Sequence, residues 1–289
     1  MAKYGMPYMG SKGKIADWVI DQLPSGKRLV DLFSGGGAIS HCAKLSGKWD
    51  TVLYNELNPL VCEVLQDAMD GKYSYDVFKP EWVSREAFMA KRDTCGYVRY
   101  IWSFGNNGSG YLFGKDIEEY KRMFHQMVVF GDYTDNIYPD LHIPDELINI
   151  KERRLWLKKW VREKLGSRTG GLEQLEQLER LQQLEQLQVS NKSYLDVELH
   201  DGDVIYCDPP YAGTAKYSKD GFNHAEFWQW VRDCPHCVVV SEYSAPEDIQ
   251  LISSIAKISL LKSGSAPRKT KQENLYWNGK GNIMAGTLF

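Results

Sequence analysis

Residues 204–211, Val-Ile-Tyr-Cys-Asp-Pro-Pro-Tyr, place an acid, two prolines and an aromatic ring at the end of an apolar run. The β-branched and aromatic residues predict a buried strand, which must stop at Asp208 because prolines donate no ladder hydrogen bond. The fixed proline φ angles hold the Asp208 carboxylate, the Pro209 carbonyl and the Tyr211 ring together, an arrangement that suits a planar ligand. In an open α/β sheet, ligands bind at this carboxyl edge. A buried strand that simply ends in a Pro-Pro turn is the alternative interpretation.

A second stretch with possible chemistry is a strand, a glycine turn and a helix. Residues 28–33 predict the strand, Ser34-Gly35-Gly36-Gly37 the turn, and residues 38–45 the helix. Glycines let the backbone approach a ligand closely, so this corner is typical of nucleotide binding. The spacing Phe-x-Gly-x-Gly differs from the Gly-x-Gly-x-x-Gly of dinucleotide enzymes, which favours a smaller nucleoside-bearing ligand.

An acid follows at the end of the next predicted strand, residues 51–56. Glu56 lies about 20 residues beyond the glycine turn, where an acid accepts hydrogen bonds from ribose hydroxyls. Asn58-Pro59 then opens a helix over residues 60–68. A solvated acid at a strand end is the alternative for Glu56.

Near the amino terminus, residues 7–20 predict a glycine-containing turn followed by an amphipathic helix. Lys12 and Lys14 at the start of this helix could hold an anionic group.

Residues 72–165 interrupt the alternation of strands and helices and predict an inserted, mainly helical domain. It contains a loop of Gly, Asn and aromatic residues (99–113), a helix over 116–129 and a basic helix over 148–165. Amide, aromatic and basic side chains together are typical of nucleic-acid recognition. An oligomer interface, a helical cap or a solvated basic helix face are the alternatives.

Leucines recur every three residues from Leu172 to Leu187. On an α-helix such leucines wind around the axis instead of forming one stripe, so an ordinary coiled coil is excluded. We therefore interpret residues 169–188 as a tolerated insertion, with a partner-binding helix as the alternative.

From Val189 the α/β pattern resumes. Residues 189–197 lead to the central strand, a polar loop (213–223) precedes a helix that begins near His224, and residues 238–241 form a strand. Residues 249–256 predict a further helix, and a basic loop from Arg268 enters a late strand. His224 is a candidate base, but a histidine beside aromatics at a helix start more often packs or caps.

Composition sets the class of protein. The chain has 289 residues, 43% apolar and 25% charged, with a net charge of −3, as is ordinary for a globular protein of one large domain or a domain with an insertion. No apolar run approaches membrane-spanning length and no signal peptide is present, so a cytoplasmic protein is expected. Six cysteines are too sparse for a disulfide framework, and Cys234-Pro-His-Cys237 lies in a predicted helix-to-strand loop rather than the strand-to-helix setting of a redox motif.

Three motifs in this order resemble the N6-adenine DNA methyltransferases of the Dam-like, or D12, class. They are Pro7-Tyr8-Met9-Gly10-Ser11-Lys12, Asp31-Leu32-Phe33-Ser34-Gly35-Gly36-Gly37 and Asp208-Pro209-Pro210-Tyr211. The resemblance covers nearly the whole chain outside the leucine repeat. It departs at Ser193-Tyr194, where many members carry an acid that helps to hold the cofactor.

The resemblance implies an α/β fold, a Rossmann-like S-adenosylmethionine-dependent sheet with an inserted helical recognition domain. It divides the chain into a catalytic domain (1–75 and 189–289), a target-recognition insert (76–168) and the repeat (169–188). The implied reaction moves a methyl group from S-adenosylmethionine to N6 of an adenine flipped out of double-stranded DNA, without a metal or covalent intermediate. The resemblance also implies a monomer or weak dimer in the cytoplasm of a bacterial or phage-infected cell. The implied biological role is restriction-modification or protection of a phage genome.

Residue roles carry over by motif. Asp208 and the Pro209 carbonyl accept the two N6 hydrogens, Pro210 fixes the turn and Tyr211 stacks on the base. The expected cofactor residues are Tyr8, Gly10, Ser11, Lys12, Asp31, Phe33, Ser34, Gly35, Gly36, Gly37, Glu56, Ser193, Tyr194 and Asp208. The expected DNA contacts are Arg99, Asn106, Asn107, Lys151, Arg153, Arg154, Lys158, Arg268 and Lys269. Methylation of cytosine N4 or of a glutamine amide, a nicotinamide oxidoreductase, and a non-catalytic DNA-binding protein are the competing functions.

Overall fold

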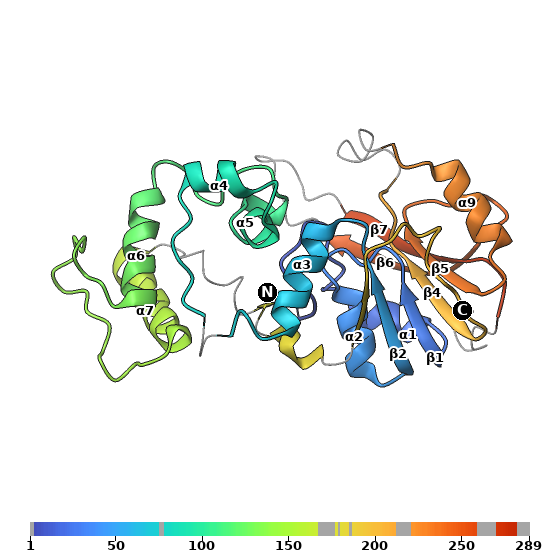
Figure 1. Ribbon diagram of the computed structural model, residues 1–289, viewed down its shortest axis with the longest axis horizontal. Helices are drawn as coiled ribbons and strands as arrows, with labels where there is room; N and C mark the ends of the chain where they lie inside the picture. Colours follow the sequence, from blue (N-terminus) through green and yellow to red (C-terminus); the bar gives the residue numbers. More distant parts are fainter. Residues whose placement is uncertain are drawn as a thin grey trace. The chain divides into compact units, whose positions relative to one another are not determined.

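A computed structural model describes residues 3–74, 78–166, 177–178, 180–184, 187–211, 221–258 and 270–281 (Figure 1). The chain divides into two compact units. We call residues 1–11 and 59–185 the helical unit, and residues 12–58 and 186–289 the sheet unit. These unit boundaries differ from the domain boundaries expected at residues 75 and 189, because the helix after Asn58 groups with the helical unit.

The sheet unit contains one sheet of seven strands within its described residues, in the order β3-β2-β1-β4-β5-β7-β6 (Figure 1). The strands are β1 (Gly26–Asp31), β2 (Trp49–Asn55), β3 (Gln188–Ser190), β4 (Asp203–Cys207), β5 (Cys237–Glu242), β6 (Gln250–Ile258) and β7 (Thr270–Trp277). The first five in spatial order are parallel, whereas β7 runs antiparallel to both neighbours. Chain direction across the sheet reverses at β1, which lies between β2 and β4, and this switch point is where such sheets bind ligands. The predicted α/β class is confirmed.

Strand register brings the predicted chemical residues to one edge. Asp31 at the end of β1 lies opposite Tyr54 on β2 and Tyr206 on β4. Glu56 and Asp208 each follow their registered tyrosine by two residues, so all three acids project from neighbouring strand ends.

Helices cover both faces of the sheet. Val30 of β1 packs in a core with Phe227 and Val231 of α9 (His224–Asp233). The next residue, Asp31, points to the other face, where it contacts Ser40 of α2 (Ala38–Ser46). The sheet unit also contains α1 (Ala16–Gln22), which packs against α2.

The helix predicted over residues 249–256 is wrong, since residues 250–256 lie in strand β6. The β6 strand pairs with β7 along its length, and a bulge between Leu251 and Ser253 places an extra residue, Ile252, in the strand. The bulge breaks strict alternation, so Ile249, Ile252 and Ile255 recur at a helix-like spacing of three. The deciding interaction is the ladder to β7, which local spacing does not reveal.

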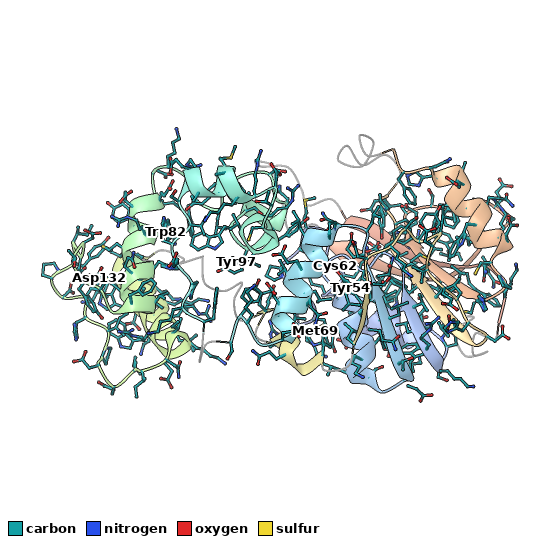
Figure 2. The ribbon with its side chains drawn as sticks, viewed as in Figure 1. Tyr54, Cys62, Met69, Trp82, Tyr97 and Asp132 are labelled. Atoms are coloured by element: carbon teal, nitrogen blue, oxygen red, sulfur yellow. The ribbon has the colours of Figure 1, made fainter. Side chains whose placement is uncertain are left out.

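The helical unit is built around aromatic side chains. Its helices are α3 (Pro59–Met69), α4 (Arg85–Lys91), α5 (Gly96–Ile101), α6 (Glu118–Phe130) and α7 (Ile150–Leu165), with the short 3₁₀ helices η1 (Phe104–Asn106) and η2 (Leu181–Leu184). Trp82, labelled in Figure 2, stacks on Phe113 with ring centroids 5.4 Å apart and also contacts Trp102 and His125. Across the described part of the chain, no helix is long and apolar enough to cross a membrane.

The leucine repeat is packed where the structure describes it. Leu178, Leu181 and Leu184 are fully buried, and η2 packs against α3. A 3₁₀ helix has three residues per turn, so leucines every three residues lie on one face of η2. These leucines are thus packed and not solvent-exposed, while the interpretation of residues 169–188 as a tolerated insertion stays a prediction. Residues 169–176 lie outside the described residues.

Truncating a repeat leucine should consequently destabilise the protein. We expect Leu181→Ala to lower the free energy of unfolding by about 2–5 kcal/mol, because it empties a fully buried site. Leu155→Ala on α7 is the matched control, since that leucine is 51% exposed. Urea unfolding of the three proteins measures the difference, and an equal cost for both variants would contradict the packing role.

Candidate active site

The glycine turn after β1 is shaped by Asp31 and by two left-handed glycines. Gly35 and Gly37 have φ angles of 48° and 72°, which L side chains rarely adopt. The Asp31 Oδ2 atom accepts hydrogen bonds from Ser40 Oγ at 2.6 Å and Ser40 N at 3.2 Å. Its other carboxylate oxygen, Oδ1, is buried and has no hydrogen-bond partner among the described residues. Burial raises the pKa of Asp31 to about 7, although the Ser40 hydrogen bonds oppose the change.

Residues of β2 and the turn after it fasten the same loop from the other side. The Tyr54 hydroxyl, on a buried ring labelled in Figure 2, donates to Gly35 O at 2.7 Å. Gly35 N and Asn58 N each donate to one oxygen of Glu56, both at 2.9 Å. Burial raises the pKa of Glu56, while these backbone hydrogen bonds lower it. Glu56 therefore lies against the glycine turn.

Aromatic rings gather beside this turn. Phe33 contacts Tyr194, Phe222 and Phe227, with ring centroids 5.3–5.8 Å apart. Next to Tyr194 in the chain, Ser193 Oγ accepts a long hydrogen bond, 3.4 Å, from Leu195 N. The structure thus places Phe33 and Tyr194 together, and a serine where an acid is common in the resembling family.

The catalytic candidate Asp208 follows β4 and is paired with Lys12. Lys12 Nζ donates to both carboxylate oxygens of Asp208, at 2.6 and 2.7 Å, and lies 3.3 Å from Glu273 Oε1. It also lies 4.7 Å from the centroid of the Tyr211 ring, a cation–π contact. Lys12 therefore contacts the carboxylate and the ring that the sequence assigns to catalysis. Pro209 is buried and Pro210 partly exposed between them.

Behind Tyr211 lies a buried hydrogen-bond network that joins three strands. The Tyr211 hydroxyl donates to Glu273 Oε1 of β7 and lies 3.2 Å from Ser241 Oγ of β5. Ser241 Oγ donates to the same Glu273 oxygen at 2.8 Å. The Tyr211 ring also meets the edge of Tyr243, with centroids 4.6 Å apart. Both the hydroxyl and the ring are thus fixed.

Charge in this network is concentrated and buried. Although burial disfavours its charge, Asp208 and Glu273 raise the pKa of Lys12, so it remains an ammonium. Burial raises the pKa of Asp208, and the Lys12 charge opposes that change. The Lys12 ammonium thus lies between the carboxylates of Asp208 and Glu273. A hydrogen-bond donor that enters beside Asp208 would compete with Lys12 for the Asp208 carboxylate.

The remaining amino-terminal candidates belong to the helical unit. The Tyr8 and Tyr100 rings are 5.4 Å apart, and Ser11 N donates to Tyr8 O. Gly10 has a φ of 88°. Within that unit, Met9 N donates to Asn106 O at 3.2 Å, which ties the segment to the η1 loop.

The η1 loop uses its amides to hold its own shape. Asn106 has a φ of 54° and donates through Nδ2 to Tyr100 O at 2.8 Å, while Asn107 Oδ1 accepts from Ser109 N. Arg99 forms an ion pair with Asp93 at 2.6 Å. Phe104 is 67% exposed at the same loop.

The basic helix α7 presents only some of the predicted cations. Lys151 is exposed and Lys158 partly exposed, whereas Arg153 donates to Val128 O at 3.3 Å. Arg154 is buried, 7% exposed, because it lies on the helix face that packs inward with Leu157 and Val161. The expectation that Arg154 belongs to an exposed basic surface is thus wrong. Arg268 and Lys269 lie outside the described residues.

Sequence reasoning missed Glu273 and Ser241. Both lie at inward positions of strands, Ser241 fully buried on β5 and Glu273, 1% exposed, on β7. Glu273 shares its sheet face with Leu275, so an acid stands where alternation calls for an apolar residue. An acid at an inward position of an alternating strand could therefore have identified Glu273 from the sequence. It is overlooked because residues 268–277 are interpreted by the basic charge of the loop that precedes the strand.

The chain is similar to a known family model and to a curated protein of Escherichia coli. A family model described as D12 class N6 adenine-specific DNA methyltransferase matches residues 8–136 and 171–230, more than half of the chain. The retron Ec67 DNA adenine methylase of Escherichia coli is 23% identical over 270 residues, covering 89% of this chain and 79% of that protein.

Solved structures are less similar. A conserved protein of unassigned function from Streptococcus pyogenes has a TM-score of 0.36 and 11% identity, covering 93% of this chain and 95% of its own. A proposed methylase from Haemophilus influenzae has a TM-score of 0.32 and 15% identity, covering 92% and 95%.

Proposed function

Because this chain belongs to the D12 class of N6 adenine-specific DNA methyltransferases, we propose that it methylates adenine N6 by direct transfer from S-adenosylmethionine, after the base leaves the duplex. The sheet is the Rossmann-like sheet of such enzymes, and DNA is the substrate class of the family. The observation that carries the finer proposal is the constellation of Asp208, Tyr211 and Lys12 at the end of β4.

The residues around the glycine turn fit S-adenosylmethionine. The buried Asp31 Oδ1, which has no hydrogen-bond partner among the described residues, suits an ammonium group such as that of the methionine part. Glu56 lies where ribose hydroxyls would be held, and Phe33 with Tyr194 offers aromatic surface for the adenine part. When bound, the cofactor supplies an electrophilic sulfonium methyl group.

Asp208 and Tyr211 suit an exocyclic amine on a planar base. The N6 lone pair of adenine is delocalised into the ring, so the amine needs an acceptor that develops its nucleophilicity and stabilises the positive charge in the transition state. The Asp208 carboxylate and the Pro209 carbonyl provide the acceptors, and the Tyr211 ring provides a stacking face. A base within a duplex cannot reach such a site, so flipping is required.

One assay separates most of the competing functions, because they differ in the labelled nucleoside that they make or in making none. Purified protein is incubated with unmethylated double-stranded DNA and S-adenosylmethionine labelled in its methyl group, and the DNA is digested to nucleosides. We expect label in N6-methyl-2′-deoxyadenosine. Label in N4-methylcytosine would contradict the choice of base. Binding of both substrates without transfer would favour a non-catalytic DNA-binding protein.

Exposed cations of α7 are proposed to contact DNA phosphates. We expect Lys151→Ala to weaken binding to DNA a few-fold and to reduce the slope of log affinity against log salt by about 1, since one phosphate contact is lost. Lys27→Ala is the matched control, because Lys27 is exposed at the amino end of β1, away from the strand ends that carry the site. Fluorescence anisotropy at several salt concentrations measures both slopes. Equal salt-dependence slopes for the two variants would show that Lys151 does not contact a DNA phosphate.

A further inference from the structure

We propose that Glu273 is a positioning residue for methyl transfer, which holds the Tyr211 ring in its stacking orientation and keeps Lys12 in the site when the target base takes over Asp208. This inference rests on the proposed function and adds a residue outside the three motifs.

The contacts of Glu273 support the first role. Its Oε1 atom accepts hydrogen bonds from the Tyr211 hydroxyl and from Ser241 Oγ, the latter at 2.8 Å. Tyr211 comes from the turn after β4, Ser241 from β5 and Glu273 from β7, so the acid links three neighbouring segments of the sheet. A stacking ring without this tether has freedom to swing about its χ angles, and an error of about 1 Å in such a group can cost roughly 10²-fold in rate.

The position of Lys12 supports the second role. Its ammonium lies between the carboxylates, 2.6 Å from Asp208 Oδ1 and 3.3 Å from Glu273 Oε1. When the amine of the base hydrogen-bonds to Asp208, Lys12 must give up at least part of its contact with that residue. A buried ammonium needs a counter-ion, and Glu273 supplies one without a large movement of the lysine.

The same arrangement explains why an acid is tolerated inside the sheet. Glu273 is 1% exposed, and an isolated carboxylate there would be costly. Two hydroxyl donors and one ammonium compensate for the burial. A purely structural role needs only an uncharged residue that fills the space, whereas the charge serves Lys12 and the hydrogen bond serves Tyr211.

Steady-state kinetics with a double-mutant cycle test the inference. We expect Glu273→Leu and Tyr211→Phe each to lower kcat for DNA about 10- to 100-fold, with the KM for S-adenosylmethionine within about threefold of wild type. Because the leucine side chain has no acceptor and the phenylalanine ring no donor, both changes break the same hydrogen bond, and the double variant should lose much less than the product of the single losses. Multiplicative losses, or wild-type kcat in either single variant, would overturn the proposal.

A serine pair provides the matched control. Ser241→Ala removes a hydroxyl that donates to Glu273 and should lower kcat. Ser254→Ala removes an exposed hydroxyl that bonds to Asn274, the next residue of β7, and should leave kcat unchanged. Equal effects of the two would indicate a general loss of strand packing and overturn the proposal.

Two further comparisons keep the outcomes distinct. If Glu273→Leu fails to fold by circular dichroism, Tyr211→Phe decides, since it keeps the ring and removes only the hydroxyl. If wild-type protein transfers no methyl group to DNA, the proposed function fails and the inference falls with it. Transfer by wild type with an unaffected Tyr211→Phe variant overturns the inference alone.

Discussion

Asp208→Ala is expected to abolish detectable methyl transfer to DNA, a loss on the order of 10³-fold, while S-adenosylmethionine still binds. The reason is electrostatic. Positive charge develops on the amine during transfer, and removal of one preorganised partner of such a charge costs about 10²–10³-fold. Loss of the hydrogen-bond acceptor also leaves the amine nitrogen conjugated with its ring and weakly nucleophilic. The glycine turn and Glu56, which hold the cofactor in our proposal, are fastened to each other and to Tyr54, so their geometry should survive the change.

The measurement separates chemistry from binding. Single-turnover transfer of labelled methyl groups gives the rate, and calorimetric titration with S-adenosylmethionine gives the affinity. Asp201→Ala is the matched control, because Asp201 is an exposed acid in the turn that precedes β4. Transfer by Asp208→Ala at more than about a tenth of the wild-type rate would refute the assigned role. Loss of cofactor affinity by more than about tenfold would instead assign Asp208 to the cofactor.

The parallel part of the fold could be predicted from sequence because its signals are local. The strand, glycine turn and helix around Asp31 are encoded by apolar runs and turn residues, and they appear as β1 and α2. The Pro-Pro turn stops β4 just before Asp208. Once those strands are parallel neighbours, their carboxyl ends meet, so the positions of Asp31, Glu56 and Asp208 follow from topology.

The antiparallel edge could not be predicted in the same way. Strand β6 is defined by its ladder to β7, and its bulge gives the isoleucines a helical spacing. The 3₁₀ helix η2 was not predicted for a related reason. Leucines at a period of three favour a 3₁₀ helix only where packing, here against α3, offsets the poorer hydrogen bonds of that helix. In both places tertiary contacts decide between conformations that local sequence leaves nearly equal.

The acid Glu273 shows the limit for the site itself. Its function depends on partners 62 and 32 positions away along the chain, Tyr211 and Ser241, and those meet only because β7 inserts beside β5. Motif-based reasoning finds residues that share a short segment. It does not find a residue that completes a site through antiparallel insertion of a strand, except as an acid out of place in an apolar pattern.

Asp31→Asn is expected to weaken S-adenosylmethionine binding at pH 8 by at least about 30-fold, because truncating one side of a buried charge pair costs about 2–5 kcal/mol. The pKa of Asp31 is raised to about 7, chiefly by burial, so in wild type the carboxylate protonates as pH falls through 7 and loses its attraction for an ammonium. As the pH falls below 7, the affinity of wild type for S-adenosylmethionine should therefore decrease, at a rate that approaches about tenfold per pH unit. The asparagine side chain of the variant does not titrate.

The ratio of wild-type to Asp31→Asn affinity is the decisive quantity, since it cancels titration of the ligand's own amino group. Calorimetric titrations between about pH 6 and 8.5 should show this ratio rising with pH and levelling above 7, the pKa of Asp31. Asp50→Asn, at an exposed acid on β2, should track wild type throughout. A ratio that stays constant with pH would mean that the ammonium is held elsewhere, and Asp31 would then serve only to shape the glycine turn through Ser40.

The same raised pKa links cofactor binding to folding with the opposite sign. Asp31 binds a proton more tightly in the folded protein than in the unfolded chain, because burial disfavours its charge. Its contribution to stability is therefore complete below the unfolded pKa of about 4 and is lost as pH rises towards 7. As pH rises towards 7, the difference in unfolding free energy between wild type and Asp31→Asn should consequently shrink. Over the same pH range the ratio of their affinities for the cofactor should grow. Both trends have one cause, because the carboxylate charge of Asp31 disfavours the fold and attracts the ligand.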